Sequence, residues 1–129
     1  MAFGTAAGIV SLAALLALLI KYPLRKLGLH RLNAFFMKLH EAASGLFFAA
    51  AIAHMAAELR KIKEKPLAAV AGFAAFAIST VLIAACHMTK DAAKKMRWHR
   101  IYSLFLALAA GGHIALAHTG AGKLQKSAK

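Results

Sequence analysis

Hydrophobic residues are gathered into four long runs that are separated by short basic segments. The runs cover approximately residues 2–20, 34–57, 67–88 and 98–118. Each holds about 20 predominantly apolar residues, the length of helix that crosses a hydrocarbon core of about 30 Å. The pattern therefore predicts an all-α fold: an integral membrane four-helix bundle with short connections, forming a single domain over residues 1–129.

Local signals indicate where these helices begin and end. Proline lacks a backbone N–H and disfavours helical geometry in the residue before it, whereas Asn, Thr and Asp are good N-caps and glycine often follows a helix. The expected boundary residues are Pro23 after the first helix, Asn33 before the second, Pro66 in the first turn of the third, Thr89 or Asp91 before the fourth, and Gly120 and Gly122 after it. No basic residue precedes the first run and no small-residue cleavage site stands out, so we expect a retained helix rather than a signal peptide.

The composition excludes an ordinary soluble domain. Apolar residues make up 61% of the 129 positions, and 17 Lys and Arg stand against 4 Asp and Glu, for a formal charge of +13. This charge suits anionic lipid headgroups. No nucleic-acid partner is expected, because membrane spans interrupt the charge and no basic stretch is long enough to form a groove. The single cysteine, Cys86, cannot form an internal disulfide.

The basic residues also predict an orientation. Four spans place both termini on one side, so the first and third connections share the other side. That side carries ten basic residues, namely Lys21, Arg25, Lys26, Arg31, Lys38, Lys90, Lys94, Lys95, Arg97 and Arg100. The opposite side carries the remaining seven. The positive-inside tendency therefore predicts that the first and third connections are cytoplasmic, and we expect a bacterial cytoplasmic membrane.

Four of the seven histidines form a regular pattern. His40 and His54 lie in the second run and His99 and His113 in the fourth, and both pairs are separated by 14 residues. In an α-helix this separation returns to within about 40° of the starting direction and places the rings about 21 Å apart. Since the two helices run in the same direction, His40 comes level with His99 and His54 with His113. Opposed imidazoles can ligate haem iron from both sides, which predicts two haem b groups, one near each leaflet.

The surrounding sequence agrees with this interpretation. Zinc fits less well, because its sites require three or four protein ligands. Attachment of the haems is expected to be non-covalent, since no Cys-x-x-Cys-His is present. Small side chains lie between the histidines, and Gly45, Gly111 and Gly112 allow close backbone approach, although small-residue contacts between membrane helices explain them equally well.

A weak internal repeat accompanies the histidines. A shift of 59 positions aligns both histidine pairs, and it also aligns Met37 with Met96, Lys38 with Arg97 and Ser44 with Ser103. Parallel repeats of this kind occur in membrane bundles, with functional sites at the repeat interface. The first and third runs show no comparable match.

The segments from Lys38 to His54 and from Arg97 to His113 resemble the dihaem b-type membrane cytochromes. In cytochrome b of respiratory complexes and in the ferric-reductase-like transmembrane family, two helices each carry two histidines about this far apart and bind two haems in a four-helix core. The resemblance covers the middle and last thirds of the chain. It implies the same four-helix core and the same four ligands here.

Ligation by two histidines leaves the iron no open position for a substrate, so the expected task is electron transfer across the membrane. The expected partner is a flavoprotein, a quinone or a soluble cytochrome. Basic residues near the ligands are candidates to pair with the haem propionates. They are Arg31, Lys38, Arg97 and Arg100 for one haem, and Arg60, Lys61 and Lys123 for the other. Arg100 is the strongest candidate, because it directly follows a proposed ligand.

Other functions remain open from the sequence. The chain could be an oxidoreductase that acts on quinol or superoxide at a haem edge, a histidine-lined metal transporter, or a structural anchor subunit. A homodimer and a place in a larger complex are also open. His30 and His118 are expected to be exposed, and His87 has either an interfacial position or a role at the cofactor.

Overall fold

A computed structural model describes residues 3–119, and this part of the chain is all-α, without strands. The helices are α1 (Phe3–Leu19), α2 (Lys21–Lys26), α3 (His30–Glu58), α4 (Pro66–Met88) and α5 (Ala92–His118), with a short 3₁₀ helix, η1 (Leu59–Lys61), after α3. Four helical segments are long and apolar enough to cross a membrane, namely Phe3–Lys26, His30–Lys61, Pro66–Met88 and Ala92–His118. The predicted fold class is confirmed.

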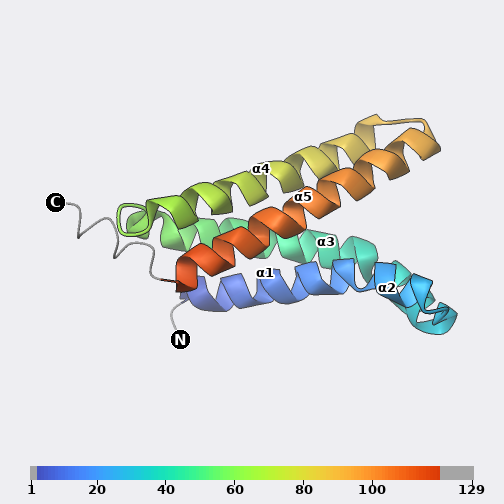
Figure 1. The fold of residues 1–129 in the computed structure, drawn as a ribbon, viewed down its shortest axis with the longest axis horizontal. Coiled ribbons are helices and arrows are strands. Elements are labelled where there is room, and N and C mark those ends of the chain that lie inside the picture. Colours follow the sequence, from blue (N-terminus) through green and yellow to red (C-terminus); the bar gives the residue numbers. More distant parts are fainter. Residues whose placement is uncertain (1–2, 120–129) are drawn as a thin grey trace. The chain divides into compact units, whose positions relative to one another are not determined.

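The chain divides after Leu59 into two compact units, and each is a helical hairpin. In the first, α1 packs along α3 and the short α2 lies in the connection between them. In the second, α4 packs along α5 after a tight turn (Figure 1). The formation of one domain by the two hairpins stays a prediction.

Small residues form the contact face of α1 in the first hairpin. Gly4, Ser11, Ala14 and Leu15 are buried, and Gly8 is half-buried. Positions 4, 8, 11 and 15 follow one another at intervals of four, three and four residues, so they share one face of the helix. Side chains of this size allow two helix backbones to approach closely, which is how helices associate where lipid removes the hydrophobic driving force.

The contact face of α4 in the second hairpin has the same spacing. Ala68 and Ser79 are buried, and the half-buried Gly72 and Ala75 lie between them. Ser79 is almost completely buried, with 2% of its surface exposed. Its hydroxyl donates to the carbonyl of Phe76 on the same helix at 2.7 Å. The close approach of α4 to α5 therefore depends on small side chains at these positions.

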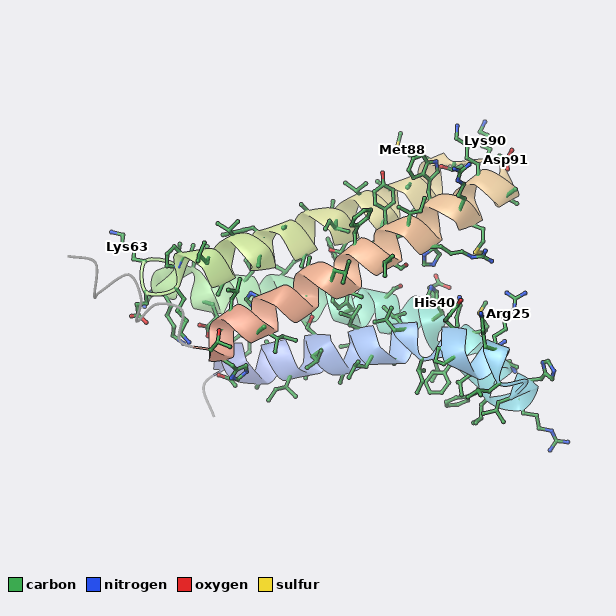
Figure 2. The ribbon with its side chains drawn as sticks, in the orientation of Figure 1. Arg25, His40, Lys63, Met88, Lys90 and Asp91 are labelled. Carbon is green, nitrogen blue, oxygen red and sulfur yellow. The ribbon has the colours of Figure 1, made fainter. Side chains whose placement is uncertain are left out.

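Two of the expected helix boundaries are confirmed. Pro66 is the first residue of α4, where its missing N–H costs nothing because the first turn has no partner for it. Asp91 is the N-cap of α5, and its side chain accepts a hydrogen bond from the backbone N–H of Lys94 at 2.9 Å. Figure 2 shows Asp91 with Met88 and Lys90 at the α4–α5 turn.

The first helix ends close to the predicted position, because α1 stops at Leu19 and the predicted span covers residues 2–20. The break at Ile20 comes shortly before Pro23, whose missing N–H removes the helical partner of the Leu19 carbonyl. Pro23 itself lies in the short helix α2, at its third position, which the sequence did not predict. The other boundary prediction in the first connection is wrong. Asn33 is not an N-cap, because α3 already begins at His30. The chain turns at Gly28, whose φ of +68° suits a residue without a side chain. The predicted ends at Gly120 and Gly122 lie outside the described residues.

Candidate functional site

The four histidines of the repeated pattern lie on the two long helices α3 and α5, and all four are half-buried. Each helix is continuous between its two histidines. The separation of 14 residues therefore corresponds to about 21 Å along the axis, with both rings on one stripe of the helix. Figure 2 labels His40, which belongs to the half of α3 nearer the connection with α2. The sequence predicts that His40 faces His99 and that His54 faces His113. Each of these pairs joins a residue of one hairpin to a residue of the other, and the pairing stays a prediction.

His54 binds the backbone of the neighbouring helix in the first hairpin. Its Nδ1 lies 2.7 Å from the carbonyl oxygen of Gly4 on α1. Gly8, one turn further along α1, lies directly against the imidazole. A Cβ added at Gly8 would be 3.0 Å from Nδ1 and 3.1 Å from Cε1 of His54. The ring is thus held between a carbonyl and a residue that has no side chain.

His113 has the same arrangement in the second hairpin. Its Nδ1 lies 2.8 Å from the carbonyl oxygen of Ala68 on α4. The residue one turn further along α4 is again a glycine, Gly72, and a Cβ there would be 3.0 Å from Nδ1 and 3.2 Å from Cε1 of His113. Two hairpins with different sequences therefore hold equivalent histidines in the same way.

This arrangement assigns the tautomer of both histidines. A backbone carbonyl can only accept a hydrogen bond, so Nδ1 of His54 and of His113 must carry the proton. In the neutral imidazole, Nε2 is then the nitrogen with the lone pair, and a lone pair is what a metal requires. Histidines that ligate metals usually donate their other ring N–H to a carbonyl or a carboxylate, which fixes the ring and raises its basicity. In both His54 and His113, Nε2 is thus the nitrogen that could coordinate a metal through its lone pair.

The other two histidines are held differently. Nδ1 of His99 lies 3.0 Å from the hydroxyl of Ser103, one turn further along the same helix. The equivalent serine in the first hairpin, Ser44, donates to the carbonyl of Glu41 at 2.7 Å. Among the described glycines, Gly8 and Gly72 are placed against His54 and His113, and none is placed in this way against His40 or His99.

The sequence analysis missed the residues that contact the histidines. Gly4 and Gly8 on α1 correspond to Ala68 and Gly72 on α4 with an offset of 64 positions, so the first and third runs do match. The offset differs from that of the histidines because the first connection is longer: the histidine and its carbonyl are 50 residues apart in the first hairpin and 45 in the second. Two small residues four positions apart near the start of each run were the available signal.

The glycines that the sequence singled out have no such role within the described residues. A Cβ at Gly45, Gly111 or Gly112 would meet nothing within 4 Å. They lie away from the contact face of their own hairpin, and at about 100° per residue Gly45 is about 140° from His40 around the helix. Gly8 and Gly72, rather than these three, are the glycines in contact with histidine.

The basic candidates lie at exposed positions near the helix ends. Arg31 and Lys38 on α3, Arg97 and Arg100 on α5, and Arg60 and Lys61 after α3 are all exposed. Lys123 lies outside the described residues. Exposed cations at the ends of membrane spans reach the headgroup level, where propionates and lipid phosphates are also found. Their pairing with propionates stays a prediction.

The three remaining histidines are exposed. His30 is the first residue of α3, His118 is the last residue of α5, and His87 lies in the last turn of α4. The expected exposure of His30 and His118 is confirmed. Trp98 and Tyr102 stack at 5.6 Å on α5, at the end of the helix that carries Arg97 and Arg100. This aromatic pair is typical of a membrane interface.

Between residues 3 and 119, no three His, Cys, Asp or Glu side chains come together in a group that could hold a metal ion. Iron in a porphyrin requires only two axial ligands, and the observation does not bear on it.

Comparisons with known proteins find no matching family model, no similar curated protein and no similar solved structure. The resemblance to dihaem cytochromes therefore rests on the spacing of the histidines alone.

Proposed function

We propose that the protein carries electrons across a membrane on two b-type haems. His40 and His99 would hold one haem, and His54 and His113 the other. Two features support this proposal: four helices are long and apolar enough to cross a membrane, and the two histidines of α3, like those of α5, are 14 residues apart. Haem requires no further protein ligand once both axial positions are filled.

The observation that carries this proposal is the contact between Nδ1 and a backbone carbonyl oxygen in both His54 and His113. Each donates its Nδ1–H to a carbonyl of the neighbouring helix, at 2.7 and 2.8 Å. A histidine buried only for packing could use either nitrogen for its hydrogen bond. Two histidines at equivalent positions both use Nδ1, which leaves Nε2 as the donor atom in each, and this is the arrangement that supports axial ligands.

A haem bound by two histidines supplies a reversible change of iron valence, with no open position for oxygen or a substrate. The task of the chain is then to hold the rings, exclude water and match the charge of the propionates. Exposed cations such as Arg97 and Arg100, which flank His99, suit the propionates. The partners would be an electron donor and an acceptor such as a flavoprotein, a quinone or a soluble cytochrome, with the first and third connections in the cytoplasm.

The test is the visible spectrum and haem content of the full chain, purified in detergent from cells that have sufficient haem. We expect a red protein with two haems per chain and the sharp reduced bands of six-coordinate b-type haem. Alanine variants then test the pairing. His54→Ala and His113→Ala should lose the same haem, and His40→Ala and His99→Ala the other. The matched controls His30→Ala, His87→Ala and His118→Ala change exposed histidines and should keep both haems.

Three results would overturn the proposal. A colourless protein that takes up no added haem excludes a cytochrome, and transport of a metal by such a protein would favour the histidine-lined transporter. Loss of both haems in every single variant would contradict two separate pairs. Retention of both haems in all four would show that these histidines are not the ligands. Repeated turnover of a quinol or of superoxide by the purified protein alone would instead favour the oxidoreductase activity.

A further inference from the structure

We propose that Gly8 and Gly72 are positioning residues that lock His54 and His113 in one tautomer and one orientation before any ligand binds. The effect on haem binding rests on the proposed function. The lock itself is a property of the haem-free chain, so it can be tested separately.

Helix geometry explains why a glycine is required at these two positions. In an α-helix the Cα–Cβ bond tilts toward the N-terminus, so the side chain of a residue lies close to the carbonyl of the residue four positions earlier. A side chain at position 8 would therefore stand beside the Gly4 carbonyl, where the imidazole of His54 has to approach. The same holds for position 72 and the Ala68 carbonyl. Without a side chain there, the carbonyl is open to a donor from the neighbouring helix.

The two hairpins together show which position matters. The residue that supplies the carbonyl is an alanine in the second hairpin, so a methyl group is accepted there beside the histidine. It is a glycine in the first hairpin, where a Cβ would meet Glu58 and Ala57 rather than His54. The residue one turn later is glycine in both. The distances explain the difference, because a Cβ at either Gly8 or Gly72 would lie 3.0 Å from Nδ1 of the histidine, closer than ordinary van der Waals contact.

An added methyl group forces the ring to move by a few tenths of an ångström. The ring cannot move away from α1 or α4 without lengthening a hydrogen bond that is now 2.7 or 2.8 Å. A longer and bent bond loses much of its strength, and the preference for the Nδ1–H tautomer weakens with it. The substitution should affect only the histidine of its own hairpin. His99, whose Nδ1 contacts Ser103 on its own helix, should not respond.

The direct test is nitrogen NMR of the full chain in detergent micelles, prepared without haem and labelled with ¹⁵N-histidine. Nδ1 and Nε2 shifts report which nitrogen is protonated. We expect His54 and His113 to give the pure Nδ1–H pattern in the unchanged chain. Gly8→Ala should move His54 alone toward a mixture of tautomers, and Gly72→Ala should do the same to His113 alone. Gly45→Ala and Gly111→Ala are matched controls in open positions and should change neither.

Haem titration then measures the consequence for the proposed site. Loss of a group that orients a metal ligand typically reduces metal affinity about 10- to 100-fold. We therefore expect Gly8→Ala and Gly72→Ala to weaken one of the two haems about tenfold, with the haem of His40 and His99 unchanged. Gly8→Val and Gly72→Val, which add more bulk at the same place, should weaken it further.

The two proposals fail in different ways. If the chain binds no haem but the NMR pattern responds as described, the lock stands and the cytochrome proposal falls. If haem binds and both alanine variants keep the unchanged tautomers and affinities, the lock is overturned and the cytochrome proposal stands. Alanine forms helices better than glycine does, so the alanine variants should remain folded, and far-UV circular dichroism verifies that they do.

Discussion

Replacement of Ser79 by leucine should separate α4 from α5. Ser79 is 2% exposed and faces α5, the helix against which α4 packs. Leucine adds two heavy atoms at a position that has no free surface, and such overpacking typically costs about 1–3 kcal/mol. Little is lost with the hydroxyl, because it donates only to the Phe76 carbonyl of its own helix, and that carbonyl also accepts from Thr80. The expected change in the free energy of unfolding is therefore the cost of overpacking.

The chain offers a matched control one residue away. Thr80 is exposed, and its hydroxyl also donates to the Phe76 carbonyl, at 3.0 Å. Thr80→Leu also loses a hydrogen bond to the Phe76 carbonyl and introduces the same apolar side chain. At this exposed position, however, the leucine does not clash with a neighbouring helix. Reversible unfolding in mixed detergent, with increasing dodecyl sulfate, measures the free energy of each variant. If Ser79→Leu were as stable as Thr80→Leu, the close contact between α4 and α5 would be wrong.

Three further substitutions test the turns, each by the same unfolding measurement. Asp91→Ala removes the cap on the Lys94 N–H and should cost about 1 kcal/mol, whereas Asp91→Asn should cost much less; equal losses would contradict capping. Gly28→Ala forces a side chain into the left-handed region, at φ +68°, and should cost about 1–2 kcal/mol; no loss would mean that the turn has another conformation. Lys65→Met removes the 2.6 Å bond from Lys65 to the Ala117 carbonyl at the end of α5 and should cost about 0.3–1 kcal/mol, less at high salt; a loss that salt does not reduce would refute the electrostatic origin.

The spans could be predicted because the thickness of a lipid bilayer sets the length of each apolar run. That length depends little on which apolar residues make up the run. The starts of α4 and α5 could also be predicted, because each depends on one residue. Pro66 acts through its backbone, which lacks an N–H, and Asp91 acts through its side chain, which caps the helix. The structure of the first connection could not be predicted in this way. Pro23 marks the end of α1 near Leu19, but the short helix α2 that contains Pro23, and the start of α3 at His30, carry no comparable signal in the sequence.

The site was predictable only in part, because the histidines have a distinctive residue type and their partners do not. His54 and His113 stand out in an apolar span. The atoms that hold them are backbone carbonyls of Gly4 and Ala68, and every residue has a carbonyl. Spans rich in alanine and leucine are apolar all round, so the face that meets a neighbouring helix cannot be read from hydrophobicity. Gly8 and Gly72 do have a distinctive residue type. They were overlooked because the connections differ in length, so the shift that aligns the histidines does not align these glycines.

The contact of His99 with Ser103 gives this histidine a freedom that His113, on the same helix, lacks. A serine hydroxyl can either give or receive a hydrogen bond, and rotation about a single bond converts one role into the other. The 3.0 Å contact can thus persist whether Nδ1 or Nε2 of His99 carries the proton. The contact with Ser103 therefore does not fix the tautomer of His99, whereas the Ala68 carbonyl beside Nδ1 of His113 does fix that of His113.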